Sequence, residues 1–141
     1  MRVIFCRSKS ISSWLVRVFS WSTWSHVVLV TPSGSCIEAR WPRVREVAMA
    51  DILEDNDVVV TSDLPCAHPD LAASWARSQV GKRYDLMAVL GVALHRDWRD
   101  DHEWFCSELV AEAFEEGGSP LFRPETIQRV TPQMIWELPS A

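Results

Sequence analysis

Short apolar runs separated by turn residues fill most of the first half of the chain, a pattern typical of β-strands joined by tight connections. Several of these runs are rich in β-branched side chains, which favour strands. The strands predicted in this way cover Arg2–Cys6, Val27–Thr31, Cys36–Trp41, Val44–Val47 and Asp57–Thr61.

In the second half of the chain, apolar residues recur with the spacing of helices. One helix is predicted over Pro69–Val80, with Leu71, Trp75 and Ser78 turned inward and Gly81 at its end. A second, strongly apolar helix is predicted over Tyr84–His95, and a charged loop follows it.

A further helix is predicted to begin at Cys106 and to end at Gly117-Gly118. Its buried face is expected to hold Leu109, Val110, Ala113 and Phe114, and its exposed face Glu108, Glu112, Glu115 and Glu116. Thr131-Pro132 predicts one last short helix, with Thr as N-cap and Pro in the first helical position.

One segment has two interpretations. After Ser10, a suitable N-cap, the residues Ile11, Trp14, Leu15, Val18 and Phe19 have the spacing of one helical face. This stripe fits an ordinary core helix, and it also fits a surface that lies on a membrane or binds a lipid. The core interpretation is favoured because few basic side chains accompany the stripe.

The connection Thr31-Pro32-Ser33-Gly34-Ser35 predicts a tight hairpin, with Gly34 free to adopt a positive φ. If Thr31 pairs with Ser35, position 28 opposes position 38 and position 26 opposes position 40. His26 and Glu38 then become diagonal neighbours on one face of the sheet. A slip of one residue would put them on opposite faces.

Length and charge narrow the class of protein. The chain has 141 residues, which predicts a single domain spanning 1–141. Its net charge of −5 argues against a nucleic-acid partner, which needs a basic face. No signal peptide and no membrane-spanning segment are recognisable, so a cytoplasmic protein without stable membrane insertion is expected, although delivery by a phage or another route would leave no trace.

The cysteines lead to the candidate chemistry. Cys6, Cys36 and Cys66 show no paired spacing and are expected to be free thiols. Cys106 differs because it opens a helix, where the macrodipole favours a thiolate and backbone N–H groups can donate to an oxyanion. Its place on the apolar face also fits a buried structural cysteine. Ser107, which follows it, is small and polar, as a crowded nucleophile site requires.

His26 is the one ionisable side chain in an otherwise apolar strand, and Glu38 follows it by twelve positions. A lone strand histidine is often a satisfied core residue. A buried carboxylate beside it has a clearer purpose, because it fixes the tautomer of the ring and stabilises the imidazolium. Together with Cys106 these residues predict a Cys-His-Glu triad with the histidine first and the cysteine last.

No metal or other cofactor is expected. His102 lies four residues before Cys106, and Cys66 lies close to His68, but the ligand pairs typical of zinc sites are missing. The sequence also has no Gly-rich phosphate loop and no HExxH motif.

The chain resembles the circularly permuted branch of the NlpC-type papain-like cysteine hydrolases, which is related to proteins resembling lecithin-retinol acyltransferase. The matching pieces are Ser25-His26-Val27, Glu38, Gly81-Lys82-Arg83-Tyr84-Asp85 and Phe105-Cys106-Ser107-Glu108-Leu109-Val110. The order histidine, polar residue, cysteine is that of the permuted members. Two departures from the family pattern are present: Phe105-Cys106-Ser107-Glu108 stands in place of Asp-Cys-Ser-Gly, and Val28 stands in place of a small residue.

The resemblance implies an α+β, circularly permuted papain-like fold, in which an antiparallel sheet packs against the helix that carries the cysteine. It implies Cys106 as nucleophile, His26 as general base and acid, and Glu38 as orienting residue. Tyr84, with Ser25 and Ser107, is expected to line the substrate and oxyanion site.

Three functions follow as expectations. The first is a thiol hydrolase of the amidase or cysteine-peptidase type, as in cell-wall hydrolases. The second is a lipid or thioester acyltransferase with the same triad, and the third is a binding module that keeps the groove without turnover. The expected partner is a peptide, an amide or an acyl lipid.

Overall fold

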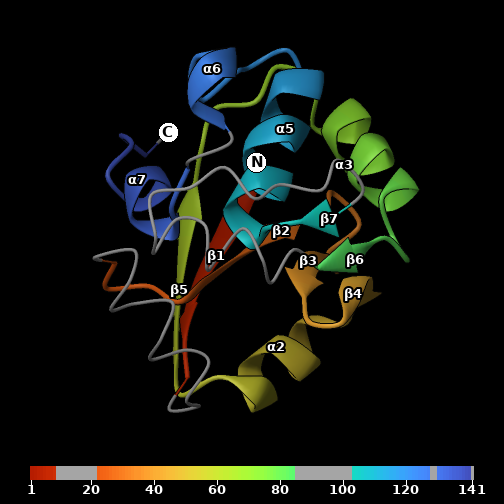
Figure 1. Cartoon of the computed structure of the whole chain (residues 1–141), viewed down its shortest axis with the longest axis vertical. Coiled ribbons are helices and arrows are strands. Elements are labelled where there is room, and N and C mark those ends of the chain that lie inside the picture. Colours follow the sequence, from red (N-terminus) through yellow and green to blue (C-terminus); the bar gives the residue numbers. More distant parts are fainter. Residues whose placement is uncertain (9–21, 85–102, 128–129, 141) are drawn as a thin grey trace.

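The computed structural model describes residues 1–8, 22–84, 103–127 and 130–140. Within these ranges, seven strands form one sheet in the order β5-β1-β2-β3-β4-β6-β7 (Figure 1). The strands are β1 Arg2–Arg7, β2 His26–Val30, β3 Cys36–Arg40, β4 Arg43–Val47, β5 Val58–Asp63, β6 Arg83–Tyr84 and β7 Glu103–Trp104. Neighbours are antiparallel from β5 to β6, and the two-residue strands β6 and β7 are parallel. With its helices, the protein is α+β.

All the strands predicted from apolar runs are present, with ends shifted by one or two residues. The helices of the described residues are α2 Met49–Asp55, α3 Pro69–Ser78, α5 Cys106–Glu116, α6 Pro124–Ile127 and α7 Pro132–Trp136. The predicted cap of the last helix is confirmed, because the Thr131 side chain accepts a hydrogen bond from the Met134 amide and Pro132 is the first helical residue.

The two faces of the sheet pack against different helices, because successive side chains of a strand point to opposite sides. On one face, side chains of the central strands pack against α3 and α5; this cluster includes Phe5, Val27, Leu29, Ile37, Ala39, Ala72, Cys106, Leu109 and Phe114. On the other face, Ile4, Cys6, Val28, Val30 and Cys36 pack with Ile52 of α2. Figure 1 shows α3 and α5 side by side and α2 apart from them.

The inward face predicted for α3 is wrong at Leu71 and Ser78, which are both exposed. The helix instead buries Ala72, Ala73 and Ala76. Small side chains let α3 lie close to the end of α5, where a Cβ added to Gly117 would come within 3.0 Å of the Cβ of Ala72. Close packing therefore selects the alanine face and leaves the leucine outside, although Trp75 does pack against the core as predicted.

Glu108 was expected on the exposed face of its helix, and this is also wrong, because the residue is buried. Its carboxylate accepts a hydrogen bond from the backbone N–H of Phe105 at 3.4 Å, as the glutamate of a capping box does. The N-terminal end of α5 therefore holds this carboxylate in place.

Two predicted helices fall partly or wholly outside the described residues. The stripe from Ile11 to Phe19 lies there, and so does most of the helix predicted over Tyr84–His95. Tyr84 itself belongs to strand β6 and not to the start of a helix.

Candidate active site

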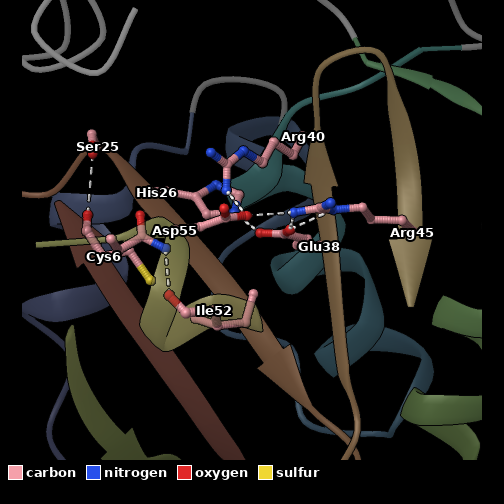
Figure 2. Close-up of polar contacts among 9 residues, drawn as sticks. Cys6, Ser25, His26, Glu38, Arg40, Arg45, Ile52 and Asp55 are labelled. Atoms are coloured by element: carbon pink, nitrogen blue, oxygen red, sulfur yellow. Dashed lines mark hydrogen bonds and ion pairs between the residues drawn. The ribbon is translucent and has the colours of Figure 1, made fainter. Parts of the chain in front are cut away.

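His26 and Glu38 are in direct contact. The Nε2 atom of the imidazole lies 2.5 Å from the Oε2 atom of the carboxylate. The Glu38 side chain is completely buried, and the His26 side chain is 12% exposed. Figure 2 shows the imidazole and the carboxylate facing each other from neighbouring strands.

The hairpin between β2 and β3 produces this contact. The Thr31 amide donates to the Ser35 carbonyl at 2.9 Å, and Gly34 has a φ of +90°. Leu29 pairs with Ile37 in the resulting ladder. This is the register predicted from the sequence, in which His26 and Glu38 are diagonal neighbours on one face.

The second oxygen of Glu38 is also bound. Nε of Arg45 donates to Oε1 at 2.7 Å, and Arg45 stands directly opposite Glu38 in the ladder between β3 and β4. Both carboxylate oxygens therefore have cationic or protonatable partners. A fully buried carboxylate without such partners would carry a large desolvation cost.

These contacts set the charge of both groups. Burial alone would raise the pKa of Glu38, but the hydrogen bonds and charges of His26 and Arg45 lower it to about 2. Burial alone would lower the pKa of His26, but hydrogen bonds with Cys106 and Glu38 raise it to about 9. Near neutral pH the pair is therefore an imidazolium and a carboxylate.

Cys106 is the first residue of α5 and is buried. It packs in the cluster that contains Val27 and Leu29, and its side-chain hydrogen bond contributes to the raised pKa of His26. Since Nε2 of His26 is held by Glu38, Nδ1 is the ring nitrogen left for the thiol. Cys106 packs on the α5 side of the sheet, whereas His26 and Glu38 share the side of Val28, so the thiol meets the imidazole at the start of β2, beyond the paired residues of the β2–β3 ladder.

The other predicted site residues have different surroundings. The Ser107 hydroxyl donates to the carbonyl of Val130 at 2.5 Å and is fully buried. The Ser25 hydroxyl donates to the carbonyl of Cys6 at 3.2 Å. Both hydroxyl protons are committed to backbone carbonyls, so they give no support to a role at an oxyanion. Tyr84 is placed by its backbone in β6, and its side chain lies outside the described residues.

Arg45 and Asp55 were missed by the sequence reasoning. Extending the strand register through the second hairpin would have found Arg45, because Arg40 pairs with Arg43 and this places Glu38 opposite Arg45. Asp55 carried no comparable signal. It ends α2, a short helix that the apolar pattern did not indicate.

Two kinds of feature are not found among the residues that the structure describes. None of the described helices is both long and apolar enough to cross a membrane. In the same ranges, no group of three or more His, Cys, Asp or Glu side chains is arranged to hold a metal ion.

Comparisons with known proteins bear on the fold. No family model matches the chain, and no curated protein matches it. Among solved structures, the chain is similar to the crystal structure of metalloprotein yiiX from Escherichia coli O157:H7, a DUF1105 protein. The TM-score is 0.74 and the sequence identity 17%, over 99% of this chain and 92% of that one. The chain therefore shares the fold of that protein.

Proposed function

We propose that this chain is a cysteine hydrolase that cleaves amide or ester bonds through Cys106, His26 and Glu38. The observation that carries the proposal is the imidazole held between a thiol and a buried, ionised carboxylate. A nucleophile beside a base, with a third group that orients the base, is the arrangement that thiol hydrolases need.

The chemistry follows from the proton positions. In the resting enzyme the thiol proton is already on Nδ1 of the His26 imidazolium, and the Cys106 thiolate attacks the substrate carbonyl, forming a C–S bond. The imidazolium then donates its proton to the leaving nitrogen or oxygen as the C–N or C–O bond breaks. Water attacks the resulting thioester, His26 accepts one proton from it, and the C–S bond breaks to release a carboxylic acid.

Glu38 assists each proton transfer without itself being protonated. Its Oε2 atom accepts the Nε2 proton of His26, so the ring presents Nδ1 to Cys106. The negative charge also stabilises the imidazolium until its proton passes to the leaving group, and again after the ring takes a proton from water. Its pKa of about 2 keeps the carboxylate ionised throughout the neutral range.

The same residues agree with a circularly permuted papain-like fold of the NlpC type, and we propose this relationship on the order His26, Glu38, Cys106 along the chain. The thioacyl intermediate is common to a hydrolase and an acyltransferase, which differ in the acceptor. The first function is proposed because the cluster accounts for hydrolysis with water as the acceptor.

The test is the mass of Cys106 after exposure to a panel of acyl donors, namely peptide amides, phospholipids and fatty-acyl thioesters. We expect one acyl group on Cys106 that turns over in water, and no adduct on Cys106→Ser. Cys66→Ser is the matched control and should still be acylated, because Cys66 lies away from the cluster. An adduct that transfers to an added amine or alcohol in preference to water identifies the acyltransferase. If no donor of the panel acylates Cys106, both enzymatic functions are contradicted and the binding module is the function that fits.

A further inference from the structure

Ion pairs continue beyond the candidate triad. Glu38 accepts from Arg45, and Nη2 of Arg45 lies 3.0 Å from Oδ2 of Asp55. The same Oδ2 atom accepts from Nη1 of Arg40 at 2.8 Å. We call Glu38, Arg45, Asp55 and Arg40 the ion-pair chain. Figure 2 shows these side chains converging beside His26.

The ion-pair chain alternates in sign and runs from the interior to the surface. Glu38 is completely buried, whereas the Arg45 side chain is 42% exposed. Its members come from three elements: β3 carries Glu38 and Arg40, β4 carries Arg45, and α2 ends at Asp55. Asp55 therefore joins the arginines of two adjacent strands through one oxygen atom.

Arg45 has a fixed geometry in this arrangement. Its Nε and Nη2 atoms both approach Oε1 of Glu38, and Nη2 also approaches Asp55. The planar guanidinium can meet two carboxylates at once, which a lysine ammonium on a flexible stem does poorly. The Glu38 carboxylate is thus held on one side by Arg45 and faces His26 with its other oxygen.

We propose that Arg45, anchored by Asp55, is a positioning residue that orients Glu38 and shares its charge. The shared charge keeps His26 from being stabilised too strongly as an imidazolium, so that the ring can return its proton. This role rests on the proposed function, but the electrostatic link from Arg45 to His26 is measurable without turnover.

Loss of Arg45 and loss of Asp55 are expected to shift the pKa of His26 in opposite directions. The ring contacts Glu38 of β3, and Arg45 of β4, Asp55 of α2 and Arg40 of β3 follow in the ion-pair chain that starts at this carboxylate. Among the described residues, Cys106 of α5 and Cys6, the ladder partner of His26 in β1, are the other titratable groups near the ring. Without the Arg45 cation, the negative charge of Glu38 is no longer partly neutralised, so it stabilises the His26 imidazolium more strongly. Without the Asp55 anion, Arg45 neutralises Glu38 more fully, so the imidazolium is stabilised less.

The experiment is an NMR titration of the His26 ring in the full chain. In Arg45→Met we expect its pKa to rise by about 0.5, and in Asp55→Asn to fall by a smaller amount. Arg43→Met is the matched control, since Arg43 lies on the same strand but donates to the carbonyl of Gly81. It should leave the pKa of His26 unchanged.

Arg45→Lys separates orientation from charge and covers the case in which Arg45→Met fails to fold. The lysine keeps the cation, so the pKa of His26 should stay near that of the wild type. Steady-state kinetics on an acyl donor that works should show a lower kcat with an unchanged KM, as expected for lost positioning.

Equal pKa values of His26 in Arg45→Met and Arg43→Met would overturn the proposal. A shift of the same sign in Arg45→Met and Asp55→Asn would do so as well, as would an unchanged kcat in Arg45→Lys. These outcomes are distinct from failure of the proposed function. A chain that shows the predicted pKa shifts but no acyl adduct keeps the electrostatic link and loses the hydrolase.

Discussion

The Oε2 atom of Glu38 lies 2.5 Å from Nε2 of His26, and the carboxylate has no exposed surface. A buried carboxylate is stable when its partners compensate the desolvation. His26 and Arg45 do this from opposite sides of the carboxylate, so the stability of the fold and the state of the imidazole depend on the same group.

Replacing Glu38 by Ala should therefore destabilise the fold and lower the pKa of His26. Loss of one partner from a buried ion pair costs about 3 kcal/mol, because the remaining charge is left uncompensated. Urea denaturation measures the first effect and an NMR titration of the ring the second. Glu46→Ala is the control, since Glu46 pairs with Arg77 at the surface and should cost under about 1 kcal/mol. Equal losses of stability in the two variants would mean that the buried ion pairs of Glu38 stabilise the fold no more than the surface pair of Glu46.

The raised pKa of His26 predicts an alkaline loss of stability. The stabilisation from the imidazolium is fully present below pH 6.5, the ordinary pKa of histidine, and disappears as the pH rises through about 9. The lowered pKa of Glu38 predicts a loss of stability at acidic pH. Its contribution is present above pH 4.5 and is lost as the pH falls through about 2.

Denaturation midpoints measured across the alkaline range should therefore decline in the wild type. His26→Asn removes the titrating group, so its decline over the same range should be smaller. Parallel declines in the two proteins would show that His26 is not the group responsible.

Ser107 is expected to act in the fold and not in the chemistry. Its buried hydroxyl ties α5 to the Val130 carbonyl, and Ser107→Ala leaves that carbonyl without its donor, at a cost of about 1–3 kcal/mol. The rate of acylation of the folded variant should be unchanged. Ser62→Ala is the control, because the Ser62 hydroxyl meets Ser140 in an exposed contact and its loss should change stability little. A stable Ser107→Ala variant with a strongly reduced rate of acylation would instead support a role of Ser107 at the oxyanion.

The hairpin was predictable because short-range chemistry determines it. Gly34 permits the turn, the β-branched strand permits the ladder, and together they allow one register that brings His26 to Glu38. The same logic applied to the next hairpin reaches Arg45. Asp55 could not be predicted in this way, since its contacts with Arg45 and Arg40 depend on how α2 packs against the strands.

The errors at Leu71 and Glu108 have another origin. Helical periodicity shows which residues share a face, but it does not show which face packs closest to a neighbouring helix or which carboxylate turns back to cap its own helix. Ala72 against Gly117 decides the first, and the Phe105 amide decides the second. Both depend on contacts made after the elements exist.

The most direct test of the account compares the alkylation rates of individual cysteines near neutral pH by mass spectrometry. Exposure alone favours Cys66, which is half-buried, whereas Cys6, Cys36 and Cys106 are buried. Burial raises the pKa of Cys6 to about 12 and, together with Glu38, that of Cys36 to about 11, so neither should react readily. Activation by His26 instead predicts that Cys106 reacts fastest and that His26→Ala slows Cys106 while leaving Cys66 unchanged. Labelling of Cys66 before Cys106, with a Cys106 rate that does not respond to His26→Ala, would contradict the assignment of Cys106 as the nucleophile.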